Sequence, residues 1–165
     1  MHFIGEFINT LNLAADPLFE ITDELASKKP SPDKWSKKEI LGHLIDSASN
    51  NHKRFVLSQY KYDLMFEGYE QDKWVEVQRY NNADWDLLVN LWLTLNSHIV
   101  HIMRSTPFEV LTKNHKNHNL HEVAWEAVPE NEETTLEYFY LDYVGHMKHH
   151  LNQILEEQDN QNPEK

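Results

Sequence analysis

The chain has 165 residues, of which 40% are hydrophobic and 12% aromatic, so it is long and apolar enough for one core. It carries 15 lysine and arginine residues against 27 aspartate and glutamate residues, a formal charge of -12. This charge repels phosphate backbones and anionic headgroups, so we expect neither nucleic acid nor a membrane as a partner. The absence of cysteine excludes disulfides, thiolate metal sites and a cysteine nucleophile.

The N-terminal segment has no basic region followed by an apolar core. No later segment reaches the roughly 18 consecutive apolar residues of a membrane span. We therefore expect a soluble cytoplasmic protein.

Residues 2–27 carry apolar side chains at helical spacing, but Pro17 interrupts the segment. A proline inside a helix removes one backbone hydrogen bond and crowds the preceding turn. We predict a helix that kinks or restarts at Pro17, with Asp16 as the candidate N-cap.

The next two helices have clear boundary signals. Ser36 and Glu39 stand in capping-box register, which predicts a helix over 36–58. A third helix is predicted over 84–105, where leucine, tryptophan and isoleucine recur on one face. Pro107 follows it and cannot continue it.

A fourth helix is predicted over 134–157. Thr134 and Glu137 stand in capping-box register at its start. Its apolar residues form one stripe centred near Met147, so one face of this helix should pack on the core.

These four segments predict an all-α fold, a four-helix bundle with two long connections. The connections, roughly 59–83 and 106–133, are too long for simple helix hairpins. The bundle therefore need not alternate up and down. We expect one domain over 1–158 and a polar tail over 159–165.

The chain has 11 histidines, and two of them form an HxxxH pair on the last helix. His146 and His150 are neighbours on one flank of the apolar stripe, close enough to bind one ion. His149 falls opposite the stripe and should face solvent. Such a pair also occurs as two ordinary boundary histidines, so both interpretations stay open. Met147 follows the first histidine, which excludes the HExxH motif of zinc proteases.

A narrow polar strip that could line a cavity runs along the helix predicted over 36–58: His43, Ser47, Asn50 and Arg54. Gly42 and Gly145 directly precede a histidine of each helix, and small residues there should allow close approach of backbone, ligand or substrate. His98 and His101 are three residues apart on the third helix, but His101 points away from its apolar stripe, and His115, His118 and His121 lie in the second connection.

Two segments resemble the signature regions of the DinB/YfiT superfamily: KWSKKEILGHLIDSASNNHKRF (34–55) and DYVGHMKHHLNQIL (142–155). The resemblance implies a four-helix bundle of the DinB type, expected as a homodimer. It also implies a divalent metal ion held by one histidine of the second helix and two of the last. Those positions are His43, His146 and His150. Imidazole suits zinc, nickel and iron alike, so the metal stays open.

Three imidazole ligands leave a coordination position open, which is typical of a catalytic metal. The resemblance implies either a thiol transferase of the kind that uses bacillithiol or mycothiol, or a metal-dependent hydrolase. We predict transfer of a low-molecular-weight thiol to a small-molecule substrate. Arg54 is the candidate partner of a carboxylate on that thiol. The alternative is that Arg54 is solvated or ion-paired. For hydrolysis, Asp46 and Asp142 are the candidate proton acceptors, or they orient the ligating imidazoles. A non-catalytic metal-binding module is the third alternative.

Overall fold

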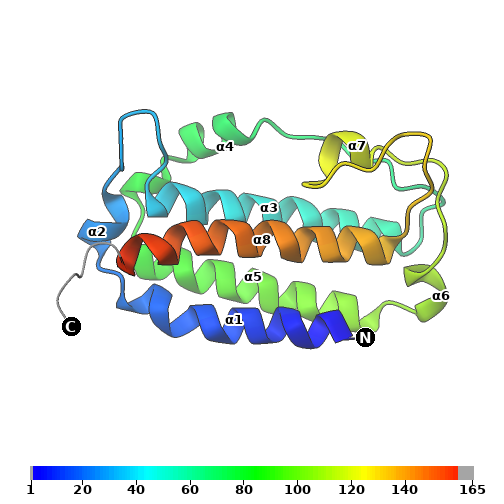
Figure 1. Ribbon diagram of the computed structural model, residues 1–165, viewed down its shortest axis with the longest axis horizontal. Coiled ribbons are helices and arrows are strands. Elements are labelled where there is room, and N and C mark those ends of the chain that lie inside the picture. The colour runs from blue at the N-terminus through cyan, green and yellow to red at the C-terminus, as the bar shows by residue number, and fades with distance from the viewer. Residues whose placement is uncertain (1, 160–165) are drawn as a thin grey trace.

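The computed structural model describes residues 2–159 and confirms an all-α four-helix bundle (Figure 1). The long helices are α1 (His2–Glu20), α3 (Lys37–Ser58), α5 (Trp85–Ser105) and α8 (Leu136–Asp159). Within this described range there are two isolated bridges and no strand. No helix in the described range has the length and apolar content needed to cross a membrane. The predicted polar tail, apart from Asp159, lies outside the described residues.

The bundle does not alternate up and down. Helices α1 and α3 each contact both α5 and α8, so α1 and α3 lie diagonally opposite each other. Figure 1 shows α1 and α8 running in one direction and α3 and α5 in the other. The consecutive helices α3 and α5 are therefore parallel, and the long connection between them lets the chain return to the same end. This confirms the expectation drawn from the connection lengths.

The two long connections are tied to each other. The first contains α4 and a short 3-10 helix, the second two short helices: α4 (Gln71–Gln78), η1 (Tyr80–Asn82), α6 (Phe108–Leu111) and α7 (Leu120–Val123). Leu64 and His118 form an isolated bridge between them. The Asn119 side chain donates to the Phe66 carbonyl (2.8 Å) and accepts from the Phe66 N–H (2.9 Å). Figure 1 shows α4 and α7 on the same side of the bundle, beyond α3.

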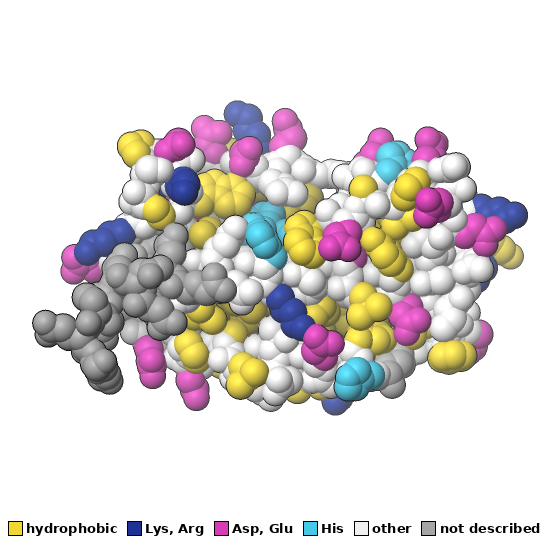
Figure 2. All heavy atoms as spheres, in the orientation of Figure 1, with side chains coloured by type: hydrophobic (Ala, Val, Ile, Leu, Met, Phe, Trp, Pro, Cys, Tyr) yellow, Lys and Arg dark blue, Asp and Glu magenta, His cyan; other side chains and the backbone are white. Residues whose placement is uncertain are grey.

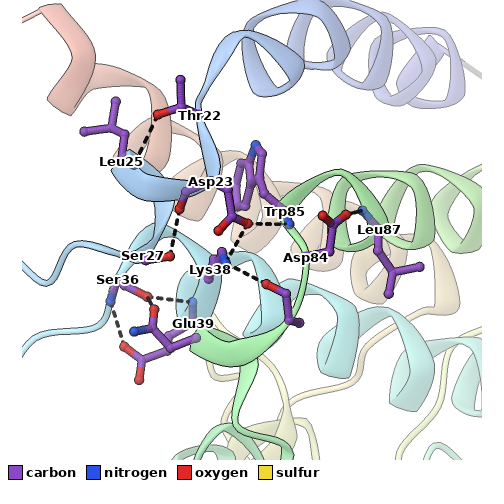
Figure 3. Close-up of polar contacts among 12 residues, drawn as sticks. Thr22, Asp23, Leu25, Ser27, Ser36, Lys38, Glu39, Asp84, Trp85 and Leu87 are labelled. Atoms are coloured by element: carbon purple, nitrogen blue, oxygen red, sulfur yellow. Dashed lines mark hydrogen bonds and ion pairs between the residues drawn. The ribbon is translucent and has the colours of Figure 1, made fainter.

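Side-chain caps begin α3 and α5, the first as predicted (Figure 3). The Ser36 hydroxyl accepts from the Glu39 N–H (3.2 Å), and the Glu39 carboxylate accepts from the Ser36 N–H (2.8 Å). The Asp84 carboxylate accepts from the Leu87 N–H (2.8 Å). Each cap satisfies a backbone donor that the helix itself leaves unpaired.

A buried lysine joins three helix starts at one end of the bundle. Lys38 is buried, and its ammonium donates to the Asp23 carboxylate (2.7 Å) and to the Ala83 carbonyl (2.6 Å). Asp23, the first residue of α2 (Asp23–Ser27), also accepts from the Trp85 N–H (3.0 Å). Figure 3 shows these groups converging between α2, α3 and α5.

The predicted restart of the first helix at Pro17 is wrong. Helix α1 continues through Pro17 to Glu20, and Asp16 is an interior residue rather than a cap. Pro17 lies in the last turn, and the following Leu18 is fully buried, so core packing offsets the missing hydrogen bond. The break comes after α1, where Thr22 caps α2.

The predicted cap of the last helix is displaced by one residue. The Thr135 hydroxyl, not that of Thr134, accepts from the Tyr138 N–H (3.1 Å). Thr134 is instead paired through its backbone with His115, with N–H to carbonyl distances of 2.7 and 3.1 Å. This pairing ends the second connection and fixes where α8 begins.

The core is continuous along the bundle. Its largest fully buried side chains come from all four long helices: Trp85, Trp92, Tyr140, Phe7, Phe55 and Phe139. On the face drawn in Figure 2, acidic side chains are spread around the outline, in keeping with the charge of -12.

Replacement of Gly42 by alanine is expected to lower the free energy of unfolding by about 1 to 3 kcal/mol, the usual cost of overpacking. A Cβ atom at Gly42 would lie 2.1 Å from the buried Tyr80 ring, which would have to move. Gly5 is the matched control on α1, because a Cβ there meets nothing within 4 Å. Gly5→Ala should stabilise by up to about 1 kcal/mol. Urea unfolding of the two variants measures both effects, and equal effects would contradict the close approach of Tyr80.

Candidate metal centre

Three histidines from two helices converge. His43 lies on α3, and His146 and His150 lie one turn apart on the antiparallel neighbour α8. One ring nitrogen from each lies within 4.8 Å of the other two. The Nε2 atoms of His43 and His146 are 3.1 Å apart. This confirms the predicted convergence of the three rings.

The spacing of these nitrogens fits a metal ion. Imidazole nitrogens bind zinc at about 2.0 to 2.1 Å, so two of them on one ion lie roughly 3 Å apart. The facing Nε2 atoms of His43 and His146 have this separation. Two neutral rings facing each other need a proton or a cation between their lone pairs. A divalent ion can bind both lone pairs and His150 as a third ligand.

Burial keeps these imidazoles neutral. It lowers the pKa of His43 to about 4 and that of His146 to about 3, with the neighbouring His150 adding to both effects. Burial also lowers the pKa of His150. At pH 7 the rings therefore carry lone pairs for a metal rather than positive charges that would repel it.

Gln153 sets the tautomer of His150. The Gln153 amide oxygen lies 2.8 Å from Nδ1 of His150, and an amide oxygen only accepts, so that nitrogen donates. The Nε2 atom of His150 then holds the lone pair. Gln153 also donates to Nε2 of His149 (3.1 Å), a residue that is exposed as predicted.

The two candidate carboxylates bind other groups than the imidazoles. Asp46 accepts from the Tyr80 hydroxyl (2.6 Å) and the Gln78 amide (2.7 Å), and burial raises its pKa above the ordinary value. Asp142 accepts from the Trp125 N–H (3.0 Å) and a second backbone N–H one residue later (2.7 Å). Among the described residues, neither carboxylate is hydrogen-bonded to a ligating ring: each holds part of a long connection, and the buried Oδ2 of Asp46 and Nδ1 of His43 have no partner.

Arg54 is neither solvated nor ion-paired within the described part of the chain. It is 6% exposed, and its guanidinium donates to the Glu67 carbonyl (2.7 Å) and the Asn51 side chain (3.3 Å). It also lies over the Phe66 ring, 5.9 Å from the centroid.

A cavity of about 190 Å³ lies beside the histidines. Helix α8 contributes His146 and His150 to its wall, and α3 contributes Ser47 and Arg54. The two long connections close it from outside, with Tyr69, Glu122 and Trp125 among the lining residues. Of the predicted polar strip of α3, Ser47 and Arg54 line this cavity, whereas His43 and Asn50 do not.

The space above the two glycines is filled by aromatic rings rather than by a ligand. Tyr80 packs on Gly42, and Trp125 lies 3.1 Å from where a Cβ of Gly145 would be. The Trp125 ring centroid is 6.3 Å from that of His146, and Trp35 lies 5.3 Å from His43. The sequence did not predict these aromatic walls, because the aromatic residues that form them do not recur at a regular spacing.

Histidines outside the cluster have other positions. His52 and His98 have ring centroids 5.2 Å apart, across α3 and α5. His115 and His118 are buried and anchor the second connection, His118 donating to the Glu132 carbonyl (2.8 Å). Within residues 2–159, the three converging histidines are the group whose ligand atoms lie close enough for one metal ion.

Comparison with known proteins agrees with this geometry. A sequence model of the DinB superfamily matches residues 9–154. The structure of YfiT from Bacillus subtilis, described as "a probable metal-dependent hydrolase with an unusual four-helix bundle topology", matches with a TM-score of 0.72 and 21% identity. The match covers 96% of this chain and 86% of that one, and establishes a shared fold. No curated protein sequence matches. Because the family match spans α3, α8 and both connections, the chain belongs to the DinB superfamily.

Proposed function

We propose that the chain is a metal-dependent transferase that joins an external low-molecular-weight thiol to a small electrophilic substrate. His43, His146 and His150 hold a divalent ion of zinc, nickel or iron. The observation that carries the proposal is the convergence of three neutral imidazoles, within 4.8 Å of one another, beside a cavity. Three ligands leave room for a fourth group at the ion.

A bound divalent ion lowers the pKa of a thiol or a water at its open position, so a nucleophile forms at neutral pH. The chain itself keeps the three rings neutral by burial and sets the His150 tautomer through Gln153. Trp125 covers His146 from outside and narrows access. Because the chain has no cysteine, the thiol must come from outside.

The contacts of the two predicted carboxylates, Asp46 and Asp142, favour a thiol over water. Hydrolysis needs a proton acceptor within hydrogen-bond reach of the attacking water. The Asp142 oxygens accept from two backbone N–H groups. Asp46 accepts from Tyr80 and Gln78 through Oδ1 and does not line the cavity beside the histidines. In the transfer we propose, the thiol proton passes to solvent, the sulfur bonds to the electrophilic carbon, and the leaving group departs with its bonding electrons.

Hydrolysis is the second candidate. Glu122 lines the same cavity and is exposed. Among the described residues, its carboxylate accepts one hydrogen bond, from the Asn119 side chain (3.1 Å), and lies 3.8 Å from His121. Its carboxylate is thus available as a proton acceptor. The description of YfiT as a metal-dependent hydrolase agrees with this alternative.

Metal analysis followed by two activity assays tests the proposal. The purified protein is stripped with a chelator, reloaded with zinc, nickel or iron, and assayed with thiols plus an electrophile and with esters and amides. We expect about one metal ion per chain and metal-dependent C–S bond formation. Metal-dependent ester or amide cleavage without conjugation would establish the hydrolase instead. Stoichiometric metal with neither reaction would establish a non-catalytic module.

A further inference from the structure

Tyr69 carries a hydroxyl group that has no hydrogen-bond partner among the described residues. It lies in the first long connection, two residues before α4, and is half-buried. The hydroxyl groups of the other tyrosines that are not exposed all have partners: Tyr80 with Asp46, Tyr138 with Glu126, Tyr140 with Thr106 and Tyr143 with Asn96. A hydroxyl group inside a protein normally has such a partner. That of Tyr69 is therefore available to a ligand.

Tyr69 lies beside the converging histidines. It lines the cavity of about 190 Å³ together with His146 and His150. That volume is below the roughly 300 to 1,000 Å³ of a typical ligand pocket, so a group bound there lies close to the histidines and to Tyr69. Trp74 of α4 packs against the Tyr69 ring, with the two ring centroids 5.1 Å apart, and so helps to hold it in place.

The surroundings of Tyr69 keep its hydroxyl group protonated. Burial and the Asp46 carboxylate raise the pKa of Tyr69 to about 12, and the Arg54 guanidinium opposes this effect. At neutral pH the group is therefore a hydrogen-bond donor and not a phenolate. An alkoxide ion is a stronger base than a phenolate, so it can take the proton of Tyr69.

The proposed transfer gains from a proton donor when the leaving atom is oxygen. As a carbon–oxygen bond breaks, negative charge develops on the oxygen, and a positioned donor stabilises that charge. A halide leaves without a proton and does not need the donor. An epoxide is the smallest electrophile with an oxygen leaving atom, and its oxygen stays attached to the product. No separate leaving group then has to escape from the small cavity.

We propose that Tyr69 donates its proton to the oxygen of a small epoxide substrate as the thiol sulfur attacks. The sulfur bonds to one carbon of the epoxide ring, and the bond from that carbon to oxygen breaks with its electron pair moving to oxygen. The Tyr69 hydroxyl proton passes to this oxygen, and the remaining phenolate takes up a proton from solvent. The product is a β-hydroxy thioether. The inference rests on the proposed function, because it uses the same external thiol.

Two electrophiles with the same three-carbon chain test the inference. Metal-loaded wild-type protein is assayed with 2-mercaptoethanol and either propylene oxide or 1-iodopropane. Tyr69→Phe should lower kcat/KM for propylene oxide by about 100-fold and change that for 1-iodopropane by less than about 3-fold, since only the first reaction needs the proton. Tyr60→Phe, the same change at an exposed tyrosine, should alter neither value.

Metal content and melting temperature are measured for each variant. Both should stay unchanged in Tyr69→Phe, because the hydroxyl that is removed has no partner in the described part of the chain. An equal loss of rate with the two electrophiles would assign Tyr69 a structural role and overturn the inference. An unchanged rate with propylene oxide would overturn it as well. Wild-type protein that conjugates 1-iodopropane but not propylene oxide would overturn it without any variant.

The failure of the proposed function would be visible separately, as wild-type protein that conjugates neither electrophile. The hydroxyl site is then tested without metal or thiol, by NMR of protein whose tyrosines are isotope-labelled at Cζ. Tetrahydrofuran, an unreactive cyclic ether, should shift the Tyr69 signal more than tetrahydrothiophene, because sulfur is the weaker hydrogen-bond acceptor. The signal is identified by its absence in Tyr69→Phe. A larger shift with the ether would support the donor role of Tyr69 by itself, and equal shifts would overturn it.

Discussion

Replacement of His150 by alanine is expected to weaken metal binding by more than about 100-fold, while His149→Ala changes it by less than about 10-fold. Loss of a side chain that hydrogen-bonds a metal ligand costs about 10- to 100-fold in metal affinity, and loss of the ligand itself should cost more. His150 lies with His43 and His146 in the cluster, whereas His149 is exposed and contacts Gln153. The two substitutions are adjacent on α8 and remove the same side chain, so they form a matched pair.

Competition with a chromophoric chelator measures the affinity of both variants, and circular dichroism checks that both stay helical. The stoichiometry must be measured as well, because the surface rings of His98 and His101 stack 6.0 Å apart and could bind a weak second ion. An equal loss of metal affinity in the His150→Ala and His149→Ala variants would contradict the assignment of His150 as the ligand.

Local signals in the sequence predict the fold well where they act within one helix. The capping box of α3 forms as the sequence indicates, because a capping side chain needs only its own helix. The cap of the last helix lies one residue later than predicted, because the Thr134 backbone is paired with His115, nineteen positions earlier in the chain. Helix α1 continues past Pro17 because its last turn packs on the core through the buried Leu18. This contact is tertiary, so the local sequence does not predict it.

In the candidate site, too, one part can be predicted from the sequence of a single helix and another part depends on tertiary packing. The spacing of His146 and His150 on one helix flank can be derived from the helical period alone. The approach of His43 cannot, because it depends on α3 and α8 being neighbours, and only the family resemblance implied it. The partners of Asp46 and Asp142 come from the long connections, whose path is set by tertiary packing.

The role of Asp142 leads to a second prediction. Asp142→Ala is expected to reduce the rate of the proposed thiol conjugation by about 10-fold or more and to leave metal affinity nearly unchanged. Its carboxylate accepts from the N–H groups of Trp125 and Glu126 and so fixes the segment that covers His146. Without it, two N–H groups lose charged acceptors worth about 1.5 to 3 kcal/mol each, and the segment should open. Amide hydrogen exchange at Trp125 and Glu126 should accelerate by about 10- to 100-fold.

Asp142→Asn separates an anchoring role from an acid–base role. The asparagine oxygen can still accept one of the two N–H groups, so an anchor would be partly restored and both exchange and rate should lie between wild type and Asp142→Ala. An amide has no basic oxygen, so a proton acceptor would be lost as completely in Asp142→Asn as in Asp142→Ala. Equal rates in the two variants, with normal exchange at Trp125 in Asp142→Asn, would contradict the anchoring role. That result would also make Asp142 the base of a hydrolase and reverse the order of the two candidate functions.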